Sequence, residues 1–205
     1  MTTSSPRARN PRGEGGRLRA QLVQAAAEAL DEVGDASRLS VRAIARRAGV
    51  SPTALYLHFA DRDALVAAAV DAGFAAFNAT LRNAARSNES DPFAALEATS
   101  LAYLAFVEHQ PALYAVLFSA RRPPGPGPSD PAGAGRDEGF AGLVELLRGC
   151  DPALDGAQAR ELAVAVWSSL HGFAILRTAR PKIGWPSAES YVRRMLAAHV
   201  PRGAG

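Results

Sequence analysis

The chain has 205 residues, of which 48% are hydrophobic and 21% are charged. This composition is typical of a globular protein and excludes a chain that is disordered throughout. A chain of this length can bury a sizeable core without disulfides, and its single cysteine, Cys150, excludes an intramolecular disulfide and a cysteine-rich zinc site. The formal net charge of +3 is only mildly basic and does not by itself indicate a nucleic-acid partner.

The sequence carries no evident membrane or export signal. The longest apolar run, residues 162–176, spans 15 residues and contains two serines and a histidine, so it is too short and too polar to cross a bilayer. Three arginines near the N-terminus, Arg7, Arg9 and Arg12, are not followed by the apolar stretch that signal peptides have. We therefore expect a soluble cytoplasmic protein with no membrane partner.

The first part of the chain predicts a flexible arm followed by four helices. Residues 1–16 consist mainly of Ser, Pro, Arg and Gly and predict a flexible, arginine-containing arm. From residue 17, apolar residues recur every three or four positions up to Val33, which predicts an amphipathic helix. Ser40, Ser51 and Asp61 then stand where N-caps belong, and they predict helices over residues 41–47, 52–59 and 61–86.

Further start signals predict five more helices in the rest of the chain. Asp91-Pro92 and Pro111 predict helices over residues 92–109 and 111–119, because proline suits the first turn of a helix. Residues 121–139 contain five prolines and five glycines and predict a mobile loop. Helical periodicity resumes over residues 140–148, 156–180 and 187–198. No strand alternation or internal repeat is present, so the predicted fold class is all-α.

One segment carries a functional signal. Residues 40–62 read S-V-R-A-I-A-R-R-A-G-V-S-P-T-A-L-Y-L-H-F-A-D-R, which predicts two short helices joined by a tight turn that contains Gly49. This is a helix-turn-helix arrangement, in which the second helix can enter the major groove of DNA. Five apolar residues would form the small core that fixes the crossing of the helices: Ile44, Ala45, Val50, Leu55 and Phe59.

The remaining side chains of this segment suit a DNA surface. Ser51 and Thr53 bring hydroxyls to a helix N-terminus, where main-chain N–H groups also favour phosphate. Tyr56 and His58 are amphipathic hydrogen-bond donors, and the flanking arginines Arg42, Arg46 and Arg62 can each neutralise a phosphate. A second interpretation is open from the residues alone, in which Tyr56 and His58 cover an edge of the core and the arginines are merely solvated.

The run T/S-V-R-x-I-A-x-x-A-G-V-S-x-x-x-L-Y-x-H-F resembles the TetR family of transcriptional regulators, specifically across residues 17–70. The resemblance implies an all-helical homodimer with a three-helix DNA-binding domain over residues 17–62. A linking helix and a C-terminal domain for effector binding and dimerisation would occupy residues 63–205. It also implies a nucleoid-associated repressor that binds a palindromic operator in double-stranded DNA and is released by a small hydrophobic effector.

Carried over by position, the resemblance defines the predicted DNA-binding residues. They are Arg42, Arg46, Ser51, Pro52, Thr53, Ala54, Tyr56, Leu57, His58 and Arg62. Leu57 departs from the pattern, because many members carry an aromatic or polar residue there. Leu57 and Ala54 would contact thymine methyl groups rather than form hydrogen bonds, so the operator sequence does not follow from the recognition helix.

The C-terminal part shows one further local signal. Trp167-Ser-Ser-Leu-His171-Gly172 is similar to a W-x-x-x-H-G element of one TetR subgroup. Trp167 and His171 share a helix face, and they form either a pocket wall or dimer contact, or simply part of the core. The candidate effector-binding residues are Tyr103, Phe106, Phe118, Trp167, Leu170 and His171. The last two helices are apolar enough to pair with their copies in a dimer, through Val164, Leu170, Phe173, Val192, Met195 and Leu196.

Enzyme motifs are missing from the sequence. We find no G-x-S-x-G nucleophile motif, no H-E-x-x-H zinc motif and no phosphate-binding G-x-x-x-x-G-K-[ST] loop. We therefore predict no catalytic residues, no metal and no cofactor. An alternative to the effector-controlled regulator is a helical DNA-binding protein that acts architecturally without an effector. A C-terminal cavity discriminates between the two, since only the regulator needs one.

Overall fold

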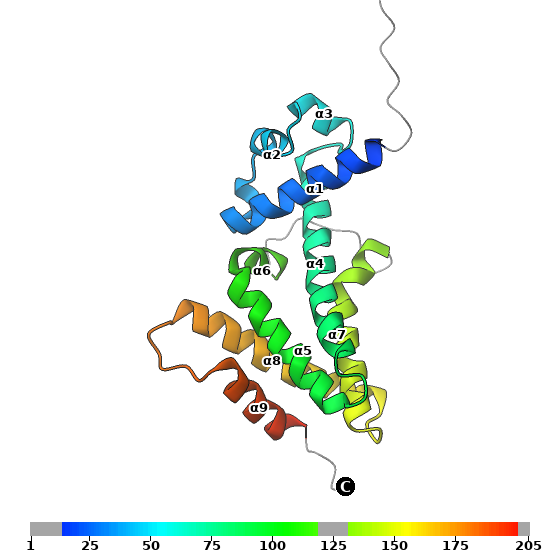
Figure 1. Ribbon diagram of the computed structural model, residues 1–205, viewed down its shortest axis with the longest axis vertical. Coiled ribbons are helices and arrows are strands. Elements are labelled where there is room, and N and C mark those ends of the chain that lie inside the picture. The colour runs from blue at the N-terminus through cyan, green and yellow to red at the C-terminus, as the bar shows by residue number, and fades with distance from the viewer. Residues whose placement is uncertain (1–13, 119–130, 201–205) are drawn as a thin grey trace, which may run out of the picture.

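The computed structural model describes residues 14–118 and 131–200, and all regular secondary structure in these residues is helical. Figure 1 shows an elongated molecule in which α1, α2 and α3 gather at one end. The long helix α4 starts at that end and runs along the body, where the remaining helices pack. The prediction of an all-α fold with a small N-terminal unit and a larger C-terminal bundle is confirmed.

The first helix, α1, spans Glu14–Val33 and begins earlier than the predicted start at residue 17. The predicted flexible arm over residues 1–16 is therefore wrong for residues 14–16, and its arginines lie outside the described residues. Glycine lowers helix propensity by about 1 kcal/mol, which is why the two glycines after Glu14 favour an arm in the sequence.

Two short helices follow α1 after a single 3-10 turn, η1, at Ala36–Arg38. They are α2, Val41–Arg47, and α3, Pro52–Tyr56. The Oγ of Ser51 accepts a hydrogen bond from the main-chain N–H of Ala54 at 3.2 Å, as the N-cap prediction requires. Gly49, in the turn between the helices, has a φ of 71°, which glycine adopts without strain. The helix α3 ends before the predicted Phe59, because the main chain tightens to i→i+3 hydrogen bonds at its end.

The central helix α4 spans Arg62–Arg86 and connects the N-terminal unit to the rest of the molecule. The carboxylate of Asp61 caps it by accepting the N–H of Ala64 at 2.7 Å. Its buried face packs against α1, α5, α6 and α7. The large buried side chains of this face are Leu65, Val66, Val70, Phe74 and Phe77. The helix α4 therefore contacts both the N-terminal helix α1 and the C-terminal helices.

The C-terminal bundle consists of α5, Pro92–His109; α6, Pro111–Leu117; α7, Pro131–Cys150; α8, Gly156–Ala179; and α9, Ala188–His199. These agree with the predicted elements except for α7, which begins at Pro131. The predicted mobile loop over residues 121–139 is therefore wrong for residues 131–139, and its part before Pro131 lies outside the described residues. The early turns of α7 are held from outside the segment, since the Asn78 amide on α4 donates to the Gly135 carbonyl at 2.5 Å.

Two helices, α4 and α8, are long and apolar enough to cross a membrane by length and composition alone. Half of the relevant α4 window is buried inside the structure, which marks α4 as a core helix. Only 28% of the α8 window is buried. The exposed apolar side chains of α8 include Val164, Ile175 and Leu176. The helix α8 therefore carries apolar side chains that the described part of the chain leaves exposed.

Candidate nucleic-acid interface and effector site

The small core predicted for the helix-turn-helix unit is present. Ile44, Ala45 and Leu55 are completely buried, and Phe59 is 4% exposed. The guanidinium of Arg19 on α1 lies 4.9 Å from the centre of the Phe59 ring, which adds a cation–π contact between α1 and the chain that follows α3. The crossing of α2 and α3 is thus set by apolar burial, and their outer faces are left for other contacts.

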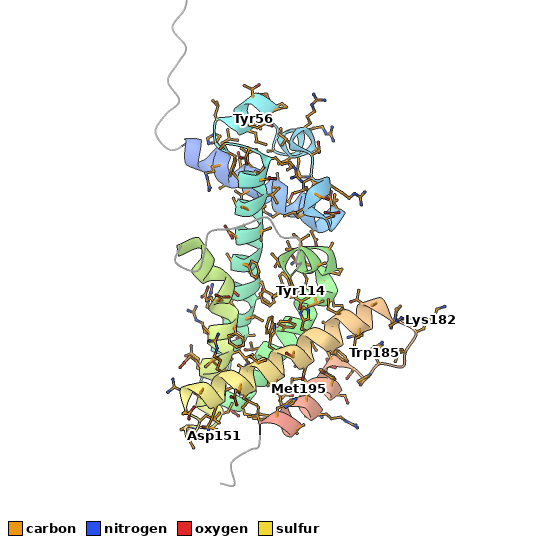
Figure 2. The ribbon with its side chains drawn as sticks, turned by 180° about the vertical axis from the view of Figure 1, so that it is seen from behind. Tyr56, Tyr114, Asp151, Lys182, Trp185 and Met195 are labelled. Carbon is orange, nitrogen blue, oxygen red and sulfur yellow. The ribbon has the colours of Figure 1, made fainter. Side chains whose placement is uncertain are left out.

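The outer face of α3 is exposed at the end of the molecule. Tyr56 is 52% exposed and Leu57 is 80% exposed, and Figure 2 shows Tyr56 at the tip, far from the C-terminal bundle. Ser51, Pro52 and Thr53 are exposed as well, whereas Ala54 and His58 are half-buried. Burying two large apolar surfaces such as those of Tyr56 and Leu57 would be favourable, so this face is suited to contact a partner.

The arginines of α2 divide into two groups. Arg42 and Arg46, both predicted DNA contacts, are exposed. Arg47 faces α1, where its guanidinium lies 2.6 Å from the Glu32 carboxylate and 3.9 Å from that of Glu28. The first two arginines can reach a phosphate from the surface, while Arg47 holds α2 against α1.

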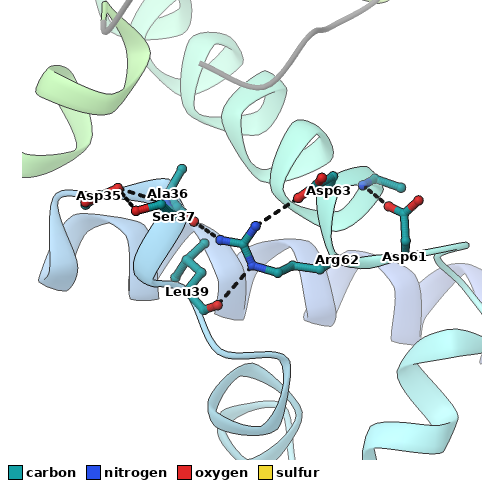
Figure 3. A network of polar contacts seen from close by, with 8 residues as sticks. Asp35, Ala36, Ser37, Leu39, Asp61, Arg62 and Asp63 are labelled. Atoms are coloured by element: carbon teal, nitrogen blue, oxygen red, sulfur yellow. Dashed lines mark hydrogen bonds and ion pairs between the residues drawn. The ribbon is translucent and has the colours of Figure 1, made fainter. Parts of the chain in front are cut away.

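Arg62 has a structural role that the sequence does not suggest. Its Nε donates to the Leu39 carbonyl at 3.1 Å, one terminal nitrogen donates to the Ala36 carbonyl, and the other lies 2.8 Å from the Asp63 carboxylate (Figure 3). The guanidinium therefore ties the start of α4 to the 3-10 turn and to the residue before the Ser40 cap. It remains one-third exposed, and its predicted contact with a phosphate stays a prediction.

In the C-terminal bundle, a polar chain joins α5, α6 and α8. The hydroxyl of Tyr103 is hydrogen-bonded to that of Tyr114, and the Tyr114 hydroxyl lies 2.5 Å from Nδ1 of His171. Burial raises the pKa of Tyr103 to about 12 and raises that of Tyr114 further, while burial lowers the pKa of His171. Neutral His171 can accept a hydrogen bond from the Tyr114 hydroxyl, and this chain of hydrogen bonds fixes the three side chains.

The predicted effector-binding residues are brought together, and three of the six are buried in the core whereas the other three are half-buried. The rings of Phe118, Trp167 and His171 are in mutual contact, with centroids 5.6–6.3 Å apart. Tyr103, Phe106 and Leu170 are each at most 5% exposed. The sequence therefore predicts correctly that these aromatic side chains cluster. Their clustering reflects burial of aromatic surface.

A cavity of about 360 Å³ lies elsewhere, between α4, α5 and α7. None of the six predicted effector residues lines this cavity, and their role in effector binding stays a prediction. Small residues of α7 leave space open there, since a Cβ built on Gly142 meets no atom within 4 Å. Its lining residues are Asn78, Leu81, Arg82, Ala85, Arg86, Glu89, Pro92, Ala95, Thr99, Glu138, Gly139, Gly142, Leu143, Glu145, Leu146 and Gly149. In the sequence, this cavity is marked only by the lining glycines Gly139, Gly142 and Gly149, of which Gly139 falls in the predicted loop.

The residues predicted for the dimer contact also need correction. Leu170, Phe173, Val192, Met195 and Leu196 are each at most 6% exposed within one chain, because α8 and α9 pack on each other and on α5. Of the predicted set, only Val164 is exposed, at 47%. Among the described residues, no group of three or more His, Cys, Asp and Glu side chains is arranged to hold a metal ion.

The fold and the exposed helix face define a helical protein with an N-terminal helix-turn-helix unit and a separate C-terminal bundle. The chain belongs to the TetR family. Residues 22–69 match the family model for bacterial regulatory proteins of the tetR family, and residues 96–199 match the model for the tetracyclin repressor-like C-terminal domain. The W-x-x-x-H-G subgroup stays a prediction.

Solved structures give the same fold, whereas no curated protein sequence matches the chain. A protein of unknown function from Rhodococcus sp. RHA1 is 25% identical, with a TM-score of 0.74 over 96% of this chain and 100% of that one. The TetR family transcriptional regulator PfmR from Thermus thermophilus is 23% identical, with a TM-score of 0.62 over 90% and 98%. The fatty acid degradation regulator FadR from Bacillus halodurans is 16% identical, with a TM-score of 0.63 over 89% and 94%.

Proposed function

We propose that this protein is a cytoplasmic, non-enzymatic repressor that binds a palindromic DNA operator as a homodimer and leaves it when a small hydrophobic effector binds. The observation that carries the proposal is the outer face of α3, where Tyr56 and Leu57 are exposed on a helix held by a buried core. Ser51 and Thr53 add exposed hydroxyl groups to this face, and the exposed arginines of α2, Arg42 and Arg46, precede them in the chain. This combination supplies base contacts and phosphate contacts from one surface.

The uncovered apolar face of α8 supports a homodimer. Two copies that bury Val164, Ile175 and their neighbours against each other would remove the largest exposed apolar side chains of this helix from water. A symmetric dimer presents two recognition helices, and successive major grooves on one side of DNA lie about 34–36 Å apart. The predicted operator is therefore a near-palindrome.

The path from effector to DNA runs through α4. This helix lines the cavity with Asn78 and Arg82 and begins with Arg62, whose guanidinium holds the N-terminal unit. An effector that favours one position of α4 changes the separation of the two recognition helices. The effector can shift the equilibrium between the two arrangements only by the difference between its binding free energies for them.

Selection of genomic DNA fragments tests the proposal. The purified full-length protein is mixed with fragmented DNA from its source, washed at moderate salt, and the retained DNA is sequenced. We expect strong enrichment of one palindrome. Tyr56→Ala should abolish the enrichment, whereas Ile183→Ala, which removes a side chain of similar exposure far from α3, should leave it unchanged.

Other outcomes contradict the proposal in different ways. Diffuse, salt-sensitive retention without a common motif would favour an architectural DNA-binding protein. Enrichment that survives Tyr56→Ala would show that the outer face of α3 is not the reading surface. The effector step is tested separately, by adding compounds to the complex of protein and enriched DNA and measuring release.

A further inference from the structure

Two buried polar atoms in the wall of the α4–α5–α7 cavity have no hydrogen-bond partner. They are Oδ1 of Asn78 on α4 and Oγ1 of Thr99 on α5. Asn78 is 2% exposed and Thr99 is 9% exposed. Buried polar atoms are nearly always hydrogen-bonded, because leaving one unpaired is costly. Both residues line the same cavity, so a ligand in this cavity is a candidate source of the missing partners.

The orientation of the Asn78 amide follows from its other contact. Its nitrogen donates to the Gly135 carbonyl, and a carbonyl can only accept, so Oδ1 must be the atom that is left unpaired. Gly139 makes room for this oxygen, because a Cβ at that position would lie 2.8 Å from it. Asn78 therefore offers an acceptor alone, whereas the Thr99 hydroxyl can both donate and accept.

The rest of the cavity is suited to an apolar body. Leu81, Ala95, Leu143 and Leu146 contribute hydrocarbon surface, and Figure 1 shows α4, α5 and α7 side by side around this region. The lining glycine Gly142 leaves open space, since a Cβ built there meets no atom within 4 Å. The volume of about 360 Å³ lies within the range of ligand sites.

Charged side chains of the cavity disfavour an anionic ligand. Arg82 is already paired with Glu138 across α4 and α7. Glu145 is paired with Arg148, which leaves Arg86 and Glu89 as the other charged lining residues, so the lining offers an anion no excess of positive charge. A carboxylate placed against Asn78 Oδ1 would bring two acceptors together with no proton between them.

We propose that this cavity is the effector site and that it binds a neutral molecule with an apolar body and a terminal hydroxyl group. The hydroxyl donates to Oδ1 of Asn78 and exchanges a second hydrogen bond with Oγ1 of Thr99. The apolar body of the ligand packs against the lining leucines Leu81, Leu143 and Leu146 and against the lining glycines of α7. The role of this ligand as an effector rests on the proposed regulatory function. Its binding to the cavity does not depend on that function.

Calorimetric titration of the full-length protein without DNA tests the inference. The probes are n-hexanol, n-octanol and n-decanol, together with methyl heptyl ether, which cannot donate a hydrogen bond, and octanoate, which is anionic. We expect at least one alcohol to bind, and the best alcohol to bind roughly tenfold or more tightly than the ether and the carboxylate, as one hydrogen bond allows.

Two variants with matched controls locate the binding. Thr99→Val should weaken alcohol binding about tenfold without lowering the melting temperature, since it removes an atom that has no partner in the free protein. Thr80→Val, which changes an exposed threonine of α4, should do neither. Gly142→Leu should fill the open space and abolish binding, whereas Ala141→Leu adds the same side chain to an exposed position of α7 outside the lining.

Failure of this inference is distinguishable from failure of the proposed function. No alcohol binding, equal binding of alcohols, ether and octanoate, or equal effects of Gly142→Leu and Ala141→Leu would overturn the site while leaving DNA selection unaffected. Alcohol binding that depends on Thr99 and Gly142, in a protein that enriches no DNA sequence, would support the ligand site and contradict the regulator.

Discussion

Arg62 has observed contacts that hold the fold together, and it is also a predicted phosphate contact. The guanidinium at the start of α4 binds the main-chain carbonyls of Ala36 and Leu39 and the carboxylate of Asp63. These contacts fix α4 relative to the segment that leads into α2. Family resemblance assigns the same residue to a phosphate, so loss of DNA binding in an Arg62 variant has two possible causes.

Stability measurements separate these causes. We expect Arg62→Ala to lower the free energy of unfolding by about 1–3 kcal/mol, because it removes charge-assisted hydrogen bonds from two part-buried carbonyls. Arg62→Lys should recover only part of the loss, since an ammonium lacks the planar fork of the guanidinium. Urea denaturation is the measurement, and Arg46→Ala, at an exposed position of α2, is the control. Equal stability of Arg62→Ala and wild type would leave the phosphate as the sole role.

His171 links the stability of the bundle to pH. Burial lowers its pKa from the ordinary value of 6.5, so the unfolded chain takes up a proton at a higher pH than the folded chain does. The contribution of His171 is complete above about pH 6.5 and is lost as the pH falls through that value toward the lowered pKa. Protonation would also remove the acceptor for the Tyr114 hydroxyl.

The pH prediction is checked by thermal melting at about pH 7.5 and about pH 5.5, on either side of the ordinary histidine pKa of about 6.5. We expect the wild-type melting temperature to fall toward the lower pH. His171→Asn, which keeps an acceptor but does not titrate, should flatten this dependence. His109→Asn, at an exposed histidine of α5, should retain it. If His171→Asn shows the same pH dependence as the wild type, other titrating groups cause that dependence.

At the scale of elements, helix starts are predictable because local chemistry determines them. Ser40, Ser51, Asp61 and Asp91 each accept a main-chain N–H of the helix that follows, as the sequence predicts. Such caps need only a side-chain oxygen at the right position in the chain. The core of the helix-turn-helix unit is predictable for a similar reason, since its apolar spacing reflects contacts between near neighbours.

The start of α7 and the cavity are not predictable, because contacts between distant residues define both. Asn78 and Gly135 meet although 57 residues separate them, and glycines of low helix propensity form a helix there because α4 holds it. Asn78 and Thr99 resemble ordinary polar residues of a helix surface in the sequence. Their burial becomes visible only when α4, α5 and α7 are placed together. The effector site is predicted from aromatic residues near α8, and Tyr103 and Phe106 of that set are buried in the core.

Ser51 provides an element-scale test of the recognition helix. Ser51→Ala should remove the α3 cap and lower the free energy of unfolding by about 1 kcal/mol. Ser51→Asp should keep the cap, because aspartate is an equally good N-cap and suits the helix dipole. It should nevertheless weaken operator binding, since its carboxylate would face the phosphates. Denaturation and DNA titration of both variants check this, and operator binding retained by Ser51→Asp would place Ser51 away from the backbone of the DNA.

At the scale of the whole molecule, the two surfaces that need partners lie on different parts of the chain. The exposed outer face of α3 is at the tip, whereas the exposed apolar side chains of α8 lie in the body (Figures 1 and 2). The long α4 lies between them and also lines the cavity. In a dimer joined through α8, the spacing of the two tips is therefore set by the bundle, and a ligand beside α4 is well placed to change it.

Separating the dimer tests this arrangement. Ile175→Arg places a charge on the apolar face of α8, where the side chain is 40% exposed in one chain. Burying that charge in an interface would be costly, so we expect a monomer in sedimentation experiments and a folded bundle by circular dichroism. Affinity for the full palindrome should fall at least roughly tenfold, because the second half-site no longer binds through a linked partner. Ile183→Arg, in the segment between α8 and α9, should remain dimeric. A dimeric Ile175→Arg with full affinity would place the interface elsewhere.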